Sequence, residues 1–496
     1  MKSRNIIYIA MAVGLSFTSC TNLESEMFNV INPGFFPKNE KDAEALVTAA
    51  AYGPFRSDYY SGIFTVASGG IQTITEMTTD LADCQWNDAV WPDVLTQNFT
   101  SNSWGVTQFY SNYVREISKM TMAMDRISNV PMSEETRKSM NAELHCGRGW
   151  LAYLLYDLYG PVPVATLEQL KTPLKNEILE RPTKEWMVSF IESELNLAVK
   201  DLPPVYNASD KNYGKFTGGL AYTVLMKLYM HEGDWTNAER CARELMKPIY
   251  GYRLVPEYKD IFTFENEKNS EIIWACQCSR SVNKQLWLAH VLPSAYPTKN
   301  ASIQKWNGYR VPWHFYRTFE RNDKRLQTLI GEFRGTDNVV YNEQNPGPVL
   351  MKGALPVKYG EDPVATGEES QVDWVIYRYA DVVTSLSEII VRKNNVVTQE
   401  AVDLLNEIRR RAGITLYTLN DFSGVADFLD KMLLNRGQEF WFEGLRRSDL
   451  IRHGKYTEFS IRYKKSQTAR PYMTLMPLPQ SIINEGKGKV VNNPEY

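Results

Sequence analysis

The sequence predicts a mainly α-helical fold. We expect tetratricopeptide-like helical hairpins to form a curved scaffold, joined to a loop-rich irregular subdomain that contains short strands. Apolar residues recur at helical spacing in several segments that end at glycine or proline. Between residues 250 and 375 this periodicity is lost, and Pro, Gly, Asn and aromatic residues are frequent. Long ordered loops on a rigid scaffold are where binding sites usually lie.

The clearest hairpin lies within residues 219–247. An apolar stripe at helical spacing predicts its first helix: Leu220, Ala221, Val224, Leu225 and Leu228. Gly233 ends this helix, and Thr236 with Glu239 predicts a capping box at the start of the next. The inner face of the second helix is Ala238, Cys241, Ala242 and Leu245. The alanines at the contact resemble those of a tetratricopeptide hairpin.

Two further hairpins follow the same logic. Residues 142–163 carry an apolar face that stops at a Gly-Pro pair, and the partner helix at 182–203 is bounded by prolines. Near the C-terminus, residues 377–395 pair with 398–414, which Thr398 caps and a glycine ends. Stacked hairpins of this kind bury a continuous core.

The first twenty residues are typical of an export signal. Lys2 and Arg4 make a positive end, and residues 6–17 are almost wholly apolar. This run of about a dozen residues is shorter than the ~20 that cross a bilayer. On this segment alone two interpretations remain: an ordinary cleaved signal that happens to contain a cysteine, or a lipoprotein signal cleaved before Cys20, whose thiol is then acylated.

Composition narrows the function classes. The net charge is -3 without a dominant basic patch, which argues against nucleic-acid binding. Aromatic residues make up 12% of the chain, with 28 Tyr and 12 Trp, and rings in such number must be buried or form contact surface. The other cysteines are odd in number and lack zinc-ligand spacing, so we do not expect disulfides or zinc to hold the fold. They are Cys84, Cys146, Cys241, Cys276 and Cys278.

Catalytic chemistry finds little support. Glu439 and Glu443 are four residues apart on one helix, a spacing that an acid and base pair can use. We favour ordinary helix ion pairs instead, between Glu443 and Arg447 and between Arg436 and Glu439. The histidines show no metal-ligand spacing, and neither a phosphate loop nor a nucleophile elbow occurs. We therefore expect no enzyme, no cofactor and no metal ion.

Several ordered blocks resemble the SusD/RagB family. They are "YRYADVV" at Tyr377–Val383, "AVDLLNEIRRRAG" at Ala401–Gly413, "NRGQEFWFEGLRRSDLIRHGK" at Asn435–Lys455 and the tail "LMPLPQSIINEGKGKVVNNPEY". The blocks "WLAYLLYDLYGPVPV" and "RPTKEWMVSFIESELNLAVKDLP" match the N-terminal half of the family in the same order. The resemblance thus covers nearly the whole chain after the signal.

The resemblance implies a location and partners. Members of this family are lipoproteins of Bacteroidetes-type bacteria, anchored by their first mature cysteine on the outer face of the outer membrane. This favours the lipoprotein interpretation, with Cys20 as the anchor. Many members bind oligosaccharides or polysaccharides and pass them to a SusC-like TonB-dependent transporter, which they cover like a hinged lid. Relatives on the RagB side handle peptides, so a peptide or glycopeptide cargo is the alternative, and a surface hydrolase is a third hypothesis.

The family pattern also divides the chain. A lipoprotein signal peptide is predicted at 1–19, followed by a lipid tether and N-terminal extension at 20–42. The N-terminal part at 43–249 contains helical hairpins and an aromatic loop at 55–112. An irregular ligand-binding insertion follows at 250–375, and the C-terminal part at 376–496 contains a helical hairpin and the family tail.

The candidate ligand site combines indole rings with neighbouring amides. The C–H faces of a sugar stack on flat indoles, while its hydroxyls seek amide groups. Trp86 precedes Asn87 in the aromatic loop, and Trp306 precedes Asn307 in the irregular region. We select these four residues together with Trp287, for which burial in the core is the equal alternative. Trp91, Trp104 and Trp313 come next, whereas Trp150, Trp186, Trp235, Trp274 and Trp441 lie on apolar faces and are expected in the core.

We expect Cys20→Ala to yield a folded protein that no longer fractionates with the outer membrane, because the short apolar segment ending at Cys20 is the only anchor that the sequence suggests. Fractionation belongs in a strain without the transporter, which otherwise retains the protein. A variant that still pellets with membranes and resists salt washing contradicts the lipid assignment.

Overall fold

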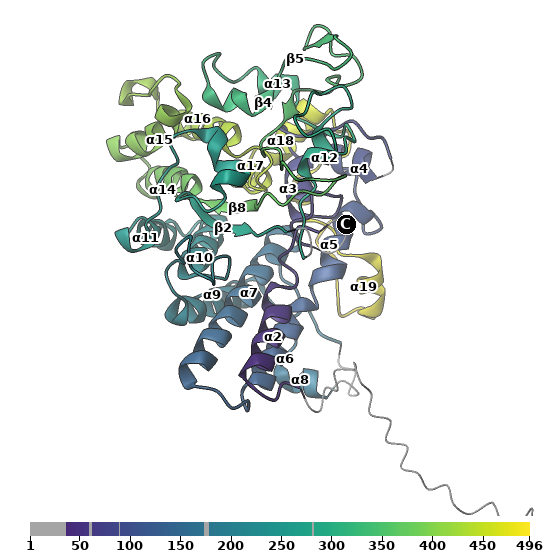
Figure 1. Cartoon of the computed structure of the whole chain (residues 1–496). Helices are drawn as coiled ribbons and strands as arrows, with labels where there is room; N and C mark the ends of the chain where they lie inside the picture. The colour runs from purple at the N-terminus through teal and green to yellow at the C-terminus, as the bar shows by residue number, and fades with distance from the viewer. Residues whose placement is uncertain (1–35, 59–61, 89, 173–177, 280–281) are drawn as a thin grey trace, which may run out of the picture.

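The computed structural model describes residues 36–58, 62–88, 90–172, 178–279 and 282–496 (Figure 1). Helices dominate this part of the chain, and its short strands form four two-stranded antiparallel sheets. The predicted mainly α-helical fold with short strands is confirmed. The predicted signal peptide and Cys20 lie outside the described residues.

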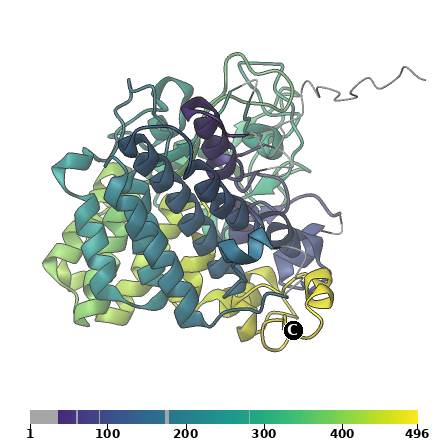
Figure 2. The same cartoon turned by 90° about the horizontal axis from the view of Figure 1, so that it is seen from below.

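A row of long helices forms the scaffold. Its members are α7 (Glu134–Tyr159), α9 (Lys184–Asp201), α10 (Gly218–Glu232), α11 (Trp235–Leu245), α14 (Tyr379–Asn394) and α15 (Gln399–Ala412). Each of these helices packs on the next, and Figure 2 shows them side by side. The contact between α11 and α14 joins hairpins from the two halves of the sequence, so the row is continuous across the irregular segment that separates them.

The hairpin of α10 and α11 follows the predicted pattern except at one cap. All members of the predicted apolar stripes of both helices are fully buried. Gly233 ends α10 in the left-handed conformation, at φ 75°. The predicted cap Thr236 is wrong, because α11 begins at Trp235 and the Asp234 side chain accepts the hydrogen bond from the Asn237 backbone N–H.

The other predicted helix ends are confirmed. Thr398 caps α15 by accepting from the Ala401 N–H, and Gly413 ends that helix in the left-handed conformation. Gly160 ends α7 at φ 73°, and α9 lies between the predicted prolines, with Thr183 as an N-cap beyond the prediction. These local signals act within one turn of the chain, so the sequence alone could reveal them.

Shorter elements make up the rest. The N-terminal ones are α2 (Glu40–Val47), α3 (Ile71–Met77), β1 (Asp83–Cys84), α4 (Val90–Thr96), α5 (Trp104–Tyr113), α6 (Glu116–Ile127) and α8 (Leu167–Lys171). The middle ones are β2 (Ile272–Cys276), α12 (Trp287–Val291), β3 (Tyr309–Arg310), α13 (Trp313–Tyr316), β4 (Leu329–Ile330), β5 (Phe333–Arg334), β6 (Val340–Tyr341), β7 (Leu355–Pro356) and β8 (Trp374–Arg378). The C-terminal ones are α16 (Val425–Phe440), α17 (Arg446–Arg452), α18 (Tyr456–Lys464) and α19 (Gln480–Glu485).

The sheets connect distant parts of the chain. The strand pairs are β1 with β3, β2 with β8, β4 with β7 and β5 with β6. In the first pair a strand of the aromatic loop is joined to one from the irregular region. In the second, β2 lies beside β8, which leads directly into α14 of the scaffold.

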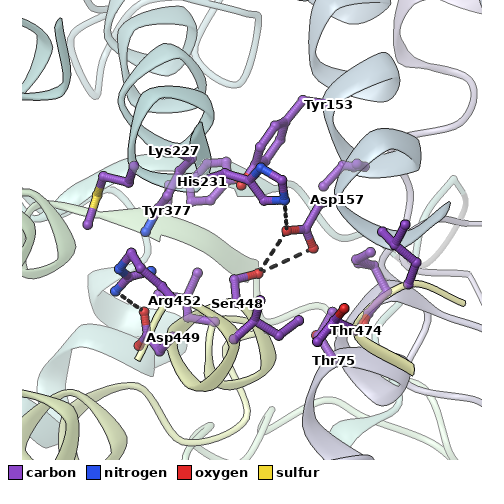
Figure 3. Close-up of a pocket in the computed structure, with 17 residues that line it drawn as sticks. Thr75, Tyr153, Asp157, Lys227, His231, Tyr377, Ser448, Asp449, Arg452 and Thr474 are labelled. Atoms are coloured by element: carbon purple, nitrogen blue, oxygen red, sulfur yellow. Dashed lines mark hydrogen bonds and ion pairs between the residues drawn. The ribbon is translucent and has the colours of Figure 1, made fainter. Parts of the chain in front are cut away.

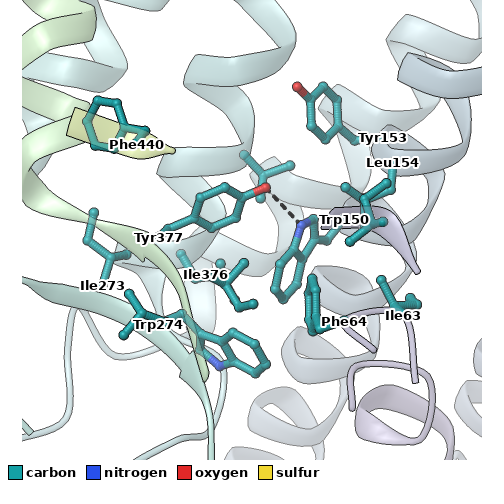
Figure 4. Packing of buried hydrophobic residues seen from close by; sticks show 14 of the residues in the cluster. Ile63, Phe64, Trp150, Tyr153, Leu154, Ile273, Trp274, Ile376, Tyr377 and Phe440 are labelled. Atoms are coloured by element: carbon teal, nitrogen blue, oxygen red, sulfur yellow. Dashed lines mark hydrogen bonds between the residues drawn. The ribbon is translucent and has the colours of Figure 1, made fainter. Parts of the chain in front are cut away.

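An aromatic cluster joins the scaffold to the β2–β8 sheet (Figure 4). Trp150 of α7 is fully buried, and its ring centroid lies 5.1 Å from that of Trp274 on β2. Its indole N–H donates to the Tyr377 hydroxyl on β8, at 3.3 Å. Phe55 stacks on the same indole, at 4.4 Å. Burial of large rings from helix and sheet in one cluster fixes their relative position.

A buried ion cluster connects the C-terminal blocks. Arg378 at the end of β8 donates to Glu271, Glu439 and Glu443, each at 2.7 Å. Arg411 also pairs with Glu271 and Glu439, while Lys358 pairs with Glu443 at 2.5 Å. The sequence-based helix pairs of Glu443 with Arg447 and of Arg436 with Glu439 are therefore wrong, since these side chains form buried contacts between elements. Arg447 instead binds Asp157 of α7, at 2.8 Å.

The described residues contain no helix with the length and apolarity needed to cross a membrane. The five cysteines in this part of the chain are free thiols, and Cys146 and Cys241 are fully buried, the latter on the predicted inner face of α11.

We expect Arg378→Met to lower the free energy of unfolding by about 3–5 kcal/mol, because removal of one partner leaves buried carboxylates with too little compensating charge. Urea unfolding at neutral pH measures this change. Arg115→Met is the matched control, since Arg115 is exposed and its contact with Glu485 is 3.9 Å long. Equal stability of both variants contradicts a structural role for the cluster.

The same cluster predicts acid sensitivity. Burial alone raises the pKa of Glu439, but Arg411, Arg378 and Arg325 outweigh it and lower that pKa from 4.5 to about 2. The folded state therefore favours the ionised form. Its contribution to stability is complete above pH 4.5 and is lost as the pH falls towards about 2. The free energy of unfolding, measured by urea at a series of pH values across this range, should fall as the pH is lowered. In Arg378→Met it should depend less steeply on pH.

Candidate ligand-binding platform

The pairing of β1 with β3 brings the two predicted tryptophan segments together. Cys84 lies opposite Tyr309 in the register, and the Gln85 N–H donates to the Gly308 carbonyl at 3.0 Å. Trp86 is thereby placed beside Trp306, although 220 residues separate them. We call Trp86 and Trp306, together with the neighbouring residues His290, Asn307, Gly308 and Arg310, the platform.

The two tryptophans contact each other through one hydrogen bond, and both rings pack on the same histidine. Trp86 donates its indole N–H to the Trp306 backbone carbonyl, at 2.9 Å. Both side chains are half-buried, so each keeps part of its surface accessible. The His290 ring lies 5.4 Å from the Trp86 ring and 4.8 Å from that of Trp306. Three rings from different segments thus form one aromatic cluster, in which His290 is buried beneath the two half-buried indoles.

His290 is an uncharged member of this cluster. Burial lowers the pKa of His290 from 6.5 to about 4, so the ring is neutral at pH 7. Its Nδ1 lies 2.9 Å from the Leu286 carbonyl, which only accepts, so Nδ1 carries the proton. His290 therefore places no charge beneath the two indoles.

Gly308 is required for the position of Trp86. A Cβ atom at this residue would lie 2.5 Å from Cζ2 of Trp86 and 2.7 Å from the His290 carbonyl oxygen. Only glycine lets the indole rest directly against the backbone here.

The base of the platform is a buried arginine. Arg310 is fully buried and donates to the Val291 and Val349 carbonyls, at 2.8 Å each. It also donates to the side-chain oxygen of Asn307, which accepts a further bond from Gln85 at 2.9 Å. Burial lowers the pKa of Arg310 to about 9, which leaves the guanidinium charged at pH 7. Carbonyl and amide dipoles surround this charge, so it lies below the platform surface.

The predicted amides differ in their surroundings. Asn87 is exposed next to Trp86, whereas Asn307 is half-buried and its side-chain oxygen already holds Arg310 and Gln85. Asn307 adopts φ 58°, which asparagine tolerates better than most residues. Its main observed contribution is to shape the turn that carries Trp306.

Trp287 requires a correction. Its side chain is only 2% exposed, and its indole N–H donates to the Pro356 carbonyl at 2.9 Å. The ring packs on Trp374 and Phe442 in the core, at 5.6 and 4.9 Å. A ring enclosed in this way cannot stack on a ligand, so the core alternative applies.

The remaining tryptophans also differ in part from expectation. Trp91 is buried beneath Trp86, Trp313 is half-buried, and Trp104 is exposed at the start of α5. Trp186 was expected in the core, but 46% of it is exposed on α9, where it stacks on Phe190 at 5.3 Å. It lies in the first turn of α9, where its backbone N–H donates to the Thr183 side chain.

The residues that support the platform carry little local signal in the sequence. His290 has no ligand spacing, and neither Gly308 nor Arg310 belongs to a motif that predicts a site. The Asn307-Gly308 pair is a turn signal directly after a tryptophan, and it was the one local indication of a special backbone at this place.

A separate cavity of about 260 Å³ lies between the scaffold and α17 (Figure 3). Ser448 donates to the Asp157 carboxylate at 3.2 Å, and His231 lies 3.8 Å from the same carboxylate. Nucleophilic catalysis needs the histidine to accept the serine proton, with the carboxylate behind the histidine. Here Ser448 and His231 both lie against the Asp157 carboxylate, whose charge Arg447 already neutralises. The three side chains therefore do not activate Ser448.

Glu439 and Glu443 do not flank a cleft. Both carboxylates are buried and bound by Arg378. A glycosidase pair must reach a substrate on both sides of the scissile bond. The two glutamates are therefore structural members of the ion cluster. Among the described residues, no group of three or more His, Cys, Asp or Glu side chains is placed to hold a metal ion.

Two family models match the chain. Residues 57–230 match the model described as "Starch-binding associating with outer membrane", and residues 326–496 match that of the SusD family. A SusD-like protein of Formosa agariphila is 23% identical, with 97% of this chain and 96% of that protein covered. The starch-binding protein SusD of Bacteroides thetaiotaomicron is 22% identical over 84% of each chain.

Solved structures share the fold. Surface glycan-binding protein A from Bacteroides thetaiotaomicron, in complex with laminarihexaose, has a TM-score of 0.74 at 18% identity and covers 92% of this chain and 100% of its own. A laminarin-binding SusD-like protein has a TM-score of 0.73 at 20% identity, with the same coverage of both chains. At these identities the similarity establishes the fold.

We expect Trp287→Ala to lower the free energy of unfolding by about 3–5 kcal/mol, because loss of a buried indole leaves a cavity in the core. Trp186→Ala, at an exposed tryptophan, is the matched control and should change stability by less than about 1 kcal/mol. Denaturant unfolding of both variants measures the difference. A Trp287→Ala variant as stable as the parent contradicts its assignment to the core.

Proposed function

The chain belongs to the SusD/RagB family, and from this premise we propose that it is a cell-surface glycan-binding lipoprotein without catalytic activity. It captures oligosaccharides on the platform around Trp86 and Trp306. It delivers them to a SusC-like TonB-dependent transporter in the outer membrane, which it covers as a lid.

The observation that carries the glycan proposal is the adjacency of Trp86 and Trp306. The two half-buried indoles come from distant segments and contact the same neutral histidine, and the Trp86 indole N–H donates to the Trp306 backbone carbonyl at 2.9 Å. Their positions are fixed before a ligand arrives, so binding costs little ordering entropy. Exposed ring surface with the amide of Asn87 beside it matches the C–H faces and hydroxyls of a sugar.

The relatives support the same class of ligand. One is named a starch-binding protein, and a protein with the same fold was solved with a laminarihexaose. The matching N-terminal family model is described as associating with the outer membrane. The transporter partner, the lid role and the lipid anchor at Cys20 rest on the family and on the N-terminal sequence.

A peptide or glycopeptide cargo is the second candidate, because the transporter partner would be the same. Peptide sites use free strand edges or hydrogen-bonding clefts. The platform offers flat rings, and the adjacent β1 is already paired with β3. The observed geometry therefore favours sugar over peptide.

We expect Trp86→Ala and Trp306→Ala each to weaken oligosaccharide binding by roughly 1–3 kcal/mol, because each removes a large aromatic contact. The double variant should nearly abolish retention on the polysaccharide that the parent binds. Affinity electrophoresis across polysaccharide and peptide panels measures retention, and product analysis of the same mixtures measures breakdown.

Two further variants sharpen this test. Trp104→Ala removes an exposed tryptophan outside the platform and should leave binding unchanged. Gly308→Ala should weaken binding although it removes no ring, because its methyl group displaces the Trp86 indole. Normal binding by the folded double variant places the sugar elsewhere, and catalytic turnover of any panel member contradicts a pure binding function.

A further inference from the structure

A second cavity, of about 360 Å³, lies apart from the platform. It is bordered by the connection between α9 and α10, by the segment after α11 and by the chain leading into β2. None of the platform residues lines it. Its volume falls in the range of small-ligand sites, roughly 300–1,000 Å³.

Tyrosines form the aromatic part of this cavity. The four that line it are Tyr206, Tyr213, Tyr250 and Tyr252. Tyr250 and Tyr252 stack at 5.7 Å with an angle of 19° between their planes. Tyr206 and Tyr213 are half-buried on the opposite segment, so part of each ring remains accessible. Rings on two segments can hold a pyranose through its C–H faces.

The floor of the cavity is rigid. Trp274 on β2 lines it and donates its indole N–H to the Gly214 carbonyl, at 3.1 Å. The same indole packs on Trp150 in the core, as Figure 4 shows. Gly219 lets the Tyr252 ring approach α10, since a Cβ there would lie 2.2 Å from the tyrosine oxygen. The cavity is therefore preformed by the scaffold core.

The ionisable side chains that line the cavity, apart from its tyrosines, are all basic. Three basic residues line the cavity, Lys215, Arg253 and Lys268, and no acidic residue does. Lys215 is balanced by Glu44 and Glu143, at 3.7 and 3.5 Å. Lys268 lies 4.9 Å above the Tyr213 ring and donates to the Ala208 carbonyl. Neither Arg253 nor Lys268 forms an ion pair within the described part of the chain.

We propose that this cavity is a second saccharide site, which binds short oligosaccharides that carry a negatively charged group. The tyrosine faces hold the sugar ring, and Arg253 with Lys268 binds a carboxylate or a sulfate ester through charge-assisted hydrogen bonds. The proposal rests on the proposed function as a glycan-binding protein. It differs from that function in the place of binding and in the charge of the ligand.

Titration calorimetry of the whole mature chain tests the proposal with three probes: trigalacturonate, a sulfated trisaccharide and neutral trigalactose. The variant Arg253→Ala/Lys268→Ala should weaken the acidic probes by about tenfold or more and leave the neutral one unchanged. Comparison of the two acidic probes identifies the anionic group. Tyr206→Ala should weaken the same probes without altering net charge.

Two controls separate this site from the platform and from general charge effects. Lys138→Ala/Arg240→Ala removes the same net charge from exposed positions outside the cavity and should change nothing. Trp86→Ala/Trp306→Ala should abolish binding at the platform yet retain acidic-probe binding. If the platform variant loses all binding while Arg253→Ala/Lys268→Ala binds normally, the second site is excluded and the proposed function stands. Parental protein that binds no acidic probe, or an equal effect of the control pair, also overturns the proposal.

Discussion

The ion pair of Arg378 and Glu439 is the contact on which the remaining structure depends. Removing these charges from water costs several kcal/mol per ion, so the cluster is stable only when every partner is in place. Its partners come from β8, from the end of α16 and from the residue before β2. The surrounding segment extends the same principle, since each of four arginines pairs with an acidic residue outside its own helix. These pairs are Arg436 with Asp381, Arg446 with Asp80, Arg447 with Asp157 and Arg452 with Glu388. The charged block at 435–455 therefore holds the fold together.

The position of the platform follows from this cluster through continuous packing. Phe442 lies between Glu439 and Glu443 and adopts φ 55°, a strained value for a phenylalanine. Its ring packs on Trp287 at 4.9 Å and stacks on Tyr309 at 6.0 Å. Tyr309 in turn lies 5.4 Å from the ring of Trp86. The buried Trp287 thus supports the platform from within the core, because the partly accessible indoles rest on rings that pack against the segment of the ion cluster.

The sequence could reveal features that act over short distances. Helical stripes and caps such as Thr398 and Gly413 are encoded within a few residues, and they appear where predicted. Selection of Trp86 and Trp306 relied on their neighbours and on the family resemblance, and strand pairing brings them together. Burial of Trp287 and the true partners of Glu439 depend on residues far outside their own helices: Trp287 bonds Pro356, 69 positions away, and Glu439 bonds Arg378, 61 positions away. Charge spacing on one helix gave the wrong pairs, because the arginines reach across to other elements instead of along the helix.

The two proposed binding surfaces differ in the physical quantity that would select a ligand. Around the platform the charge of Arg310 is buried among carbonyls and His290 is neutral, so only ring contact and amide hydrogen bonds act at the surface. In the tyrosine-lined cavity, Arg253 and Lys268 add a positive field to a chain whose net charge is -3. Each contact is modest, and two modest sites on one chain retain a polymer more strongly than either alone. Under the proposed function, modest affinity at each site would let such a pair combine capture of a long glycan with release of its segments to a transporter.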